Sequence, residues 1–182
     1  MKKLLSLLII VISFSVSLFA QSDKIHWRTI EEVEALQKKE PRKVFIDVYT
    51  TWCGPCKMMM KNTFSNKNVI KYVNANYYAV KFDAESGRNI TFKGNTYKNP
   101  GFNPYGRGRN SQHQFAQALG VSSYPTVIYM DEKMDIIAPI KGYKDPAGIE
   151  LLLKYFHDND KPSPEGFNEF QSKFKPTFHL KN

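Results

Sequence analysis

Apolar positions along this chain recur at two spacings, one typical of helices and one of buried strands. Over residues 30–40 they return every three or four positions, directly after Thr29, which forms a capping-box pattern with Glu32. Residues 44–49 are apolar at nearly every position, which is typical of a central strand covered on both faces, and Asp47 is the one polar residue among them. We therefore expect a helix followed by a buried strand.

The rest of the chain continues to alternate between the two patterns. This order predicts an α/β fold with a central mixed β-sheet flanked by helices. The further elements that we expect are an extended segment over 24–28, helices over 56–63 and 65–74, a strand over 77–82, a hairpin over 90–97, an irregular loop over 99–110, a helix from an N-cap at Ser111 through Leu119, a strand over 126–130 with a hairpin partner over 134–140, and a helix from Asp145 to about His157.

A C-terminal tail, residues 161–182, follows these elements. A helical candidate opens at Ser163, and Phe167, Phe170 and Phe174 are spaced to form one stripe. We expect this C-terminal helical extension to pack on the domain, and a helix that binds a partner is the alternative interpretation.

The first residues have the order of a secretory signal peptide. Two lysines precede an uncharged apolar run over 4–19, and Ala20 is a small residue suited to cleavage. The run is shorter than the roughly 20 residues of a bilayer span, which favours cleavage over an uncleaved membrane anchor. We therefore predict a signal peptide over 1–20, one domain over 21–160, and an exported protein that is periplasmic or extracellular.

Charge and composition exclude some functions. The net charge of +9 falls to +7 once Lys2 and Lys3 are removed with the signal peptide. This charge is spread along the chain, without the basic block or binding motif that nucleic-acid recognition requires, so no nucleic acid is expected as a partner. Aromatic residues make up 14% of the chain, which argues against general disorder.

Cys53 and Cys56 are the only cysteines of the chain. A disulfide between them closes so short a loop that it removes little entropy from the unfolded chain, which argues against a structural staple. A zinc site needs about four ligands, and none of the histidines has ligand spacing to another histidine or to a cysteine, so no metal is expected. At the start of a helix, backbone N–H groups and the helix dipole stabilise a thiolate, and a thiol one turn later can resolve a mixed disulfide. The pair is therefore predicted to be redox-active without any further cofactor.

With this pair in view, the sequence resembles the thioredoxin family. Residues 52–57, Trp-Cys-Gly-Pro-Cys-Lys, match the thioredoxin active-site motif residue for residue. Asp47 stands where thioredoxins carry a buried aspartate, and Lys81 stands where many keep a lysine near it. Tyr124-Pro125-Thr126 matches the segment that holds a cis proline beside the disulfide. The resemblance covers roughly residues 24–157 and implies a thioredoxin-like fold.

The resemblance also implies a role for each of these residues. Cys53 is the attacking thiol, Cys56 is the resolving thiol, and Asp47 takes the proton from Cys56, for which burial would raise the aspartate pKa. An aspartate that merely caps a strand end is the alternative. Pro125 has no backbone N–H, and a cis bond turns the preceding backbone toward the substrate. The residues implied to contact substrate are Trp52, Gly54, Pro55, Tyr124 and Thr126.

An insert over residues 86–110 departs from the thioredoxin pattern. It holds five of the ten glycines, five asparagines, five lysines or arginines and no acid, and it precedes the helix that leads to Pro125. A long connection of this kind is usually functional or mobile. We expect either that the insert shapes the choice of partner at the active-site rim or that it is a peripheral decoration.

These features predict an exported thiol–disulfide oxidoreductase that acts on protein disulfides or thiols. The Gly54-Pro55 pair resembles reducing thioredoxins, so reduction is the expected direction, with a membrane thiol-reducing system as the electron donor. A redox-regulated binding or chaperone module, or a dedicated thiol reductant for cytochrome c assembly, remains an alternative. The sequence does not indicate the oligomeric state.

Overall fold

The computed structural model describes residues 23–106 and 108–178 of the chain. The predicted signal peptide therefore lies outside the described residues. Within them, no helix combines the length and the apolar character needed to cross a membrane.

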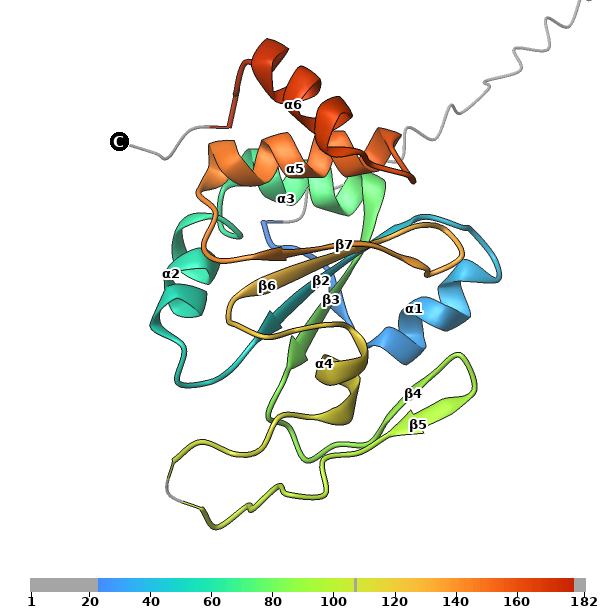
Figure 1. The fold of residues 1–182 in the computed structure, drawn as a ribbon, viewed down its shortest axis with the longest axis vertical. Helices are drawn as coiled ribbons and strands as arrows, with labels where there is room; N and C mark the ends of the chain where they lie inside the picture. The colour runs from blue at the N-terminus through green and yellow to red at the C-terminus, as the bar shows by residue number, and fades with distance from the viewer. Residues whose placement is uncertain (1–22, 107, 179–182) are drawn as a thin grey trace, which may run out of the picture.

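Five strands form the central sheet, in the order β1-β3-β2-β6-β7 (Figure 1). Strand β3 runs parallel to both β1 and β2, whereas β6 is antiparallel to β2 and β7 is antiparallel to β6. The mixed sheet expected from the sequence is thereby confirmed. The strands are β1 (Trp27–Arg28), β2 (Lys43–Tyr49), β3 (Tyr77–Asp83), β6 (Thr126–Met130) and β7 (Ile136–Lys141).

Helices cover both faces of this sheet, as the thioredoxin-like fold requires (Figure 1). One face carries α1 (Ile30–Gln37), α4 (Gln114–Ala118) and the hairpin of β4 (Ile90–Phe92) and β5 (Asn95–Tyr97). The other face carries α2 (Gly54–Asn62), α3 (Lys67–Asn76) and α5 (Pro146–Asp158), and α6 (Pro164–Lys173) lies on α5.

Strand β2 explains why its sequence is apolar at nearly every position. Val44, Ile46 and Val48 point into the core beneath α1 and α4, whereas Phe45 points into the core beneath α2, α3 and α5. Successive side chains of a strand alternate between faces, so Asp47 lies on the same face as Phe45, beneath α2. The strand therefore places a carboxyl group under the helix that carries the cysteines.

Local signals set the ends of several elements as predicted. Thr29 and Glu32 form the expected capping box, in which the Glu32 N–H donates to Thr29 Oγ1 and the Thr29 N–H donates to Glu32 Oε2. The β4–β5 hairpin turns at Lys93 and Gly94, which both have positive φ (48° and 75°). Positive φ at both residues is typical of the tight hairpin turn whose twist matches that of its strands.

Helix α4 begins later than its sequence pattern predicts. The expected N-cap, Ser111, donates its hydroxyl to Asn99 Oδ1 instead, and His113 caps the helix by accepting the Phe115 N–H at Nδ1, 3.0 Å away. His113 is fully buried, and its Nε2 lies 2.8 Å from the Arg88 carbonyl oxygen. His113 is therefore a core residue, and its ring links α4 to the start of the insert.

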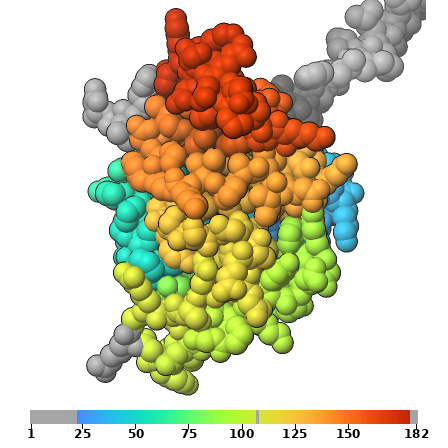
Figure 2. All heavy atoms as spheres, viewed as in Figure 1, coloured from blue at the N-terminus to red at the C-terminus, as the bar shows by residue number. Residues whose placement is uncertain are grey.

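Hydrogen bonds attach the insert to α1 and close the base of its loop. Glu31 and Glu34 of α1 accept the backbone N–H groups of Thr91 and Lys93 in the hairpin, at 3.1 and 3.0 Å. Asn99 Nδ2 donates to the Ser86 and Ser111 carbonyls at 3.2 and 2.9 Å, which closes the base of the loop that follows the hairpin. The insert lies at one end of the molecule and α6 at the other (Figure 2).

The C-terminal extension packs on the domain, as predicted. Phe167 and Phe170 of α6 contact the Tyr155 ring of α5, with ring centroids 5.1 and 5.4 Å apart. Thr177 and Phe178 lie beyond α6 and bind the buried Glu150 of α5. Glu150 accepts hydrogen bonds from the Thr177 N–H and hydroxyl at 2.6 Å and from the Phe178 N–H at 2.7 Å. This carboxylate therefore ties the tail to α5.

Candidate active site

The two cysteines form a disulfide at the start of α2, with their Cα atoms 5.3 Å apart. Cys53 is the N-cap of this helix, and Pro55 occupies its first turn, where a missing N–H costs no helical hydrogen bond. The helix begins two residues earlier than the sequence pattern predicts because Cys53 Sγ takes the place of a capping oxygen. It accepts the Cys56 N–H at 3.1 Å.

This hydrogen bond makes the two sulfurs unequal. Cys53 Sγ receives a backbone N–H and lies at the positive end of the helix dipole, and both effects favour its thiolate when the disulfide is reduced. Cys56 lies one turn further on, inside the helix. In the disulfide both residues are buried, with 3% and 4% of their surface exposed. The geometry favours Cys53 as the thiolate and Cys56 as the second thiol.

Asp47 lies on β2, beside Lys81 of β3 in the sheet register. Only 2% of its surface is exposed. Burial raises the pKa of Asp47 to about 7, although the positive charge of Lys81 acts in the opposite direction. A group with this pKa exchanges protons near neutrality, as a partner for a cysteine thiol must.

A hollow of about 490 Å³ opens on the Cys56 side of the motif. Its lining includes Cys56 and Lys57 of α2 together with Tyr49 and Lys81 from the sheet. The Lys81 ammonium lies 4.7 Å from the centre of the Tyr49 ring. The second cysteine and the lysine beside Asp47 thus border the same hollow.

The Tyr124–Pro125 peptide bond is cis, as the resemblance implies. Pro125 is buried, and Tyr124 is half-buried at the edge of the site. Thr126 is fully buried, and its hydroxyl donates to the Ser123 carbonyl at 2.7 Å. Its side chain therefore braces this segment, whereas Gly54 and Pro55 are exposed beside the disulfide.

Trp52, which precedes Cys53, is 38% exposed, and together with Glu85, Tyr124 and Arg109 it forms the active-site rim. Its indole N–H donates to Glu85 Oε1 at 3.0 Å, and its ring meets the Tyr124 ring edge to face, with centroids 5.9 Å apart. The Arg109 guanidinium lies 3.8 Å from the centre of the indole. Part of the insert therefore lies at the active-site rim.

Sequence reasoning did not identify Glu85 or Arg109 as site residues. Glu85 follows the end of β3, at the sheet edge where β2 also ends, and that placement was a usable signal. Arg109 is one of five basic residues in the insert, and no spacing in the sequence distinguishes it from the others.

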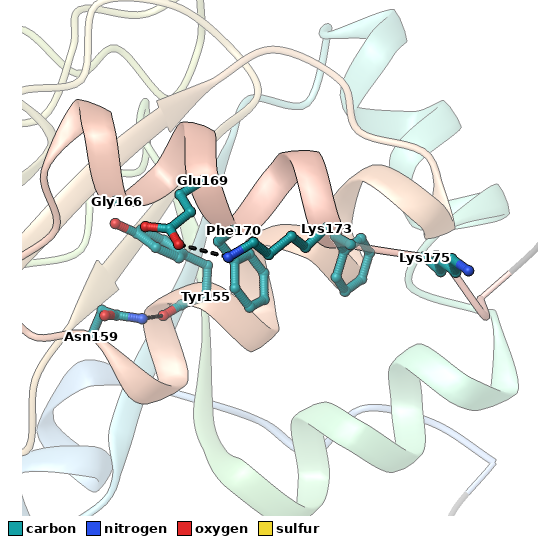
Figure 3. A pocket seen from close by; sticks show the side chains of 8 residues that line it. Tyr155, Asn159, Gly166, Glu169, Phe170, Lys173 and Lys175 are labelled. Carbon is teal, nitrogen blue, oxygen red and sulfur yellow. Dashed lines mark hydrogen bonds and ion pairs between the residues drawn. The ribbon is translucent and has the colours of Figure 1, made fainter.

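A second hollow, of about 520 Å³, lies between α5 and α6 (Figure 3). Tyr155, Phe170 and Phe174 line it, and Lys173 pairs with Glu169 at its edge, 2.7 Å away. Neither cysteine borders it, so the redox chemistry does not belong there. Within the part of the chain that the structure describes, no cluster of three or more histidine, cysteine or acidic side chains has the arrangement of a metal site.

Comparison with known proteins agrees with this architecture. Residues 30–157 match a family model described as the thioredoxin-like domain. An uncharacterized protein of Archaeoglobus fulgidus is 32% identical over 71 residues, which make up 38% of this chain and 56% of that protein. The matched region thus spans little more than half the length of that relative.

Solved structures with the same fold include an oxidoreductase, a thioredoxin and a thioredoxin-fold protein. A structure described as DsbH oxidoreductase has a TM-score of 0.51 at 14% identity, and the match covers 76% of this chain and 88% of that chain. A thioredoxin from Thermus thermophilus has a TM-score of 0.53 at 16% identity, over 72% of this chain and 86% of its own. A thioredoxin-fold protein from Helicobacter pylori has a TM-score of 0.54 at 15% identity, over 85% and 91%.

At these identities the structural likeness shows the fold alone, and the family model adds the evidence from sequence. Because that model matches most of the chain, the protein belongs to the thioredoxin-like domain family, with Cys53 and Cys56 as its thiol–disulfide redox pair.

Proposed function

We propose that this protein is an exported oxidoreductase that reduces disulfides of proteins outside the cytoplasm. In the first step the Cys53 thiolate attacks a substrate disulfide, forms a mixed disulfide and releases one substrate thiolate. Cys56 then loses its proton and attacks Cys53 Sγ, which releases the second substrate thiolate and forms the Cys53–Cys56 disulfide. Two electrons pass from the protein to the substrate in each cycle.

The hydrogen bond from the Cys56 N–H to Cys53 Sγ is the observation that carries this proposal. It supports Cys53 as the stabilised thiolate, and it lies at a helix start, where the dipole acts in the same sense. Asp47, on the strand face beneath α2 and with a pKa of about 7, is suited to accept the Cys56 proton as the mixed disulfide is resolved.

The direction of electron flow and the location rest on the sequence. Gly54-Pro55 between the cysteines resembles reducing thioredoxins, and residues 1–20 have the order of a signal peptide. Outside the cytoplasm a reductase needs a continuing supply of electrons, for which a membrane thiol-reducing system is the proposed donor.

The reduction potential of the purified mature protein tests the direction. Thioredoxin has a potential near −270 mV and the strong oxidant DsbA near −120 mV, a difference of about 150 mV or roughly 7 kcal/mol. We expect a value near that of thioredoxin, and a value near that of DsbA would refute the reductase assignment.

A turnover assay tests the chemistry itself. With dithiothreitol as reductant, the protein should accelerate the reduction of insulin, and Cys53→Ser should abolish this acceleration. Cys56→Ser should instead accumulate mixed disulfides through Cys53, and identifying the trapped proteins would name the clients. If Cys53→Ser still performed the protein's function in the cell, the binding or chaperone alternative would replace catalysis.

A further inference from the structure

The insert places a cation on the tryptophan that borders the redox pair. Arg109 lies with its guanidinium 3.8 Å from the centre of the Trp52 indole, close enough for a cation–π contact. The indole is also fixed through its N–H, which donates to Glu85 Oε1. Glu85 Oε2 in turn accepts the Asn110 N–H at 3.0 Å, which anchors the residue next to Arg109. Arg109 is therefore positioned by Trp52, which its guanidinium contacts, and by Asn110, the next residue in the chain, which Glu85 anchors.

The charges at this rim are not equally available to a substrate. The Glu85 carboxylate is half-buried, and each of its oxygens already accepts an N–H. Arg109 is exposed, and a guanidinium stacked on a ring keeps its N–H edge free to pair with a carboxylate. The rim therefore presents a positive charge outward, next to the residue that precedes Cys53.

The surrounding loop has the composition of a protein-binding surface. Phe102 and Tyr105 are 37% and 92% exposed on the same loop. Aromatic residues and arginine are enriched in protein interfaces. The loop thus suits a polypeptide substrate better than a small thiol.

We propose that Arg109 is a specificity-determining residue that favours polypeptide substrates with an acidic side chain next to their disulfide. This inference rests on the proposed disulfide reduction. The substrate carboxylate pairs with the guanidinium while the neighbouring disulfide lies over Cys53. The pairing adds no covalent step, because it changes only which disulfides reach the thiolate.

Two disulfide-bridged peptides, identical except for Glu or Gln beside one cysteine, provide the test. The rate constant for reduction by the fully reduced protein is measured for each peptide in a single turnover. Two unit charges about 5 Å apart in water interact enough for about a four-fold difference in rate, so we expect the Glu peptide to react about four times faster. In about 1 M salt, where the screening length is about 3 Å, the ratio should approach one.

Arg109→Gln should lower this ratio to about one, whereas Arg109→Lys should retain most of it. Lys98→Gln is the matched control, since it removes an exposed positive charge from the same insert, and it should leave the ratio unchanged. The proposal would be overturned if Arg109→Gln kept the four-fold preference for the Glu peptide. It would also be overturned if the unmodified protein reduced the two peptides at the same rate. Failure to reduce the Gln peptide at all would instead count against the proposed function.

Discussion

Replacing Asp47 with asparagine removes one ionisable group from beneath the redox helix and should change how stability depends on pH. Asparagine has nearly the shape of aspartic acid but cannot ionise. In the folded protein burial raises the pKa of Asp47 from its ordinary value of 3.8 to about 7. The ionised form is therefore disfavoured in the fold relative to the unfolded chain.

The sign and the size of the effect follow from these two pKa values. Below a pH of about 3.8 the group is protonated in both states and costs the fold nothing. As the pH rises toward 7, the unfolded chain releases the proton while the fold retains it, so stability falls; above 7 both states are ionised and the loss is complete. The full loss is about 4 kcal/mol, of which about 2 kcal/mol falls between about pH 5.5 and pH 8.5.

Urea unfolding of the oxidised protein at about pH 5.5, 7 and 8.5 measures this loss. The stability of Asp47→Asn relative to the unmodified protein should increase by about 2 kcal/mol over that range. Because only the change with pH is compared, any constant packing difference of the asparagine cancels. Glu165→Gln, the same chemical change at an exposed site, is the control. Parallel pH profiles for Asp47→Asn and the unmodified protein would refute the raised pKa.

Three further results are expected. Asp47→Asn should slow the resolution of the mixed disulfide at neutral pH about 10-fold or more, since general base assistance is worth about 10²–10⁴-fold; stopped-flow measurement of the second thiolate release checks this, and an unchanged rate would remove Asp47 from the proton path. Glu150→Ala should destabilise the fold by about 2–3 kcal/mol, because it deprives Thr177 and Phe178 of a charged acceptor, and limited proteolysis should then cut the tail first; equal resistance to proteolysis would contradict the anchoring role. His113→Ala should cost about 2 kcal/mol through the lost cap and the lost bond to Arg88, measured by thermal unfolding, and a loss below about 0.5 kcal/mol would contradict it.

The sequence predicted secondary structure correctly where the cause lay in burial of a whole strand or in neighbouring residues. Strand β2 is apolar on both faces because helices cover both faces of the sheet, and its run predicts that burial directly. The capping box at Thr29 and the Lys93-Gly94 turn are local, so neighbouring residues suffice to predict them. The start of α4 was predicted wrongly because Asn99, twelve residues away, binds the Ser111 hydroxyl, and the residues next to Ser111 do not reveal that contact.

The candidate site divides in the same way. The cysteine motif and its place at a helix start are local, and the sequence predicts both. The contact of Trp52 with Arg109 at the site joins positions far apart in the chain, as does the contact of Glu150 with Thr177 at the C-terminal tail. Glu150 is a charged residue within an apolar helix, which signals that it has a partner, but the sequence does not say which. For Arg109 not even that signal exists, because any of the basic residues in the insert fits its composition.

The anchored root of the insert makes the loop beyond it a replaceable module. The hairpin is fixed to α1 through Glu31 and Glu34, and Asn99 closes the base of the loop. Sequence changes between Asn99 and Asn110 therefore leave the sheet and the cysteines undisturbed as long as those anchors remain. Loops of other composition grafted onto this base should therefore change the contacts made beside Trp52 without any redesign of the core.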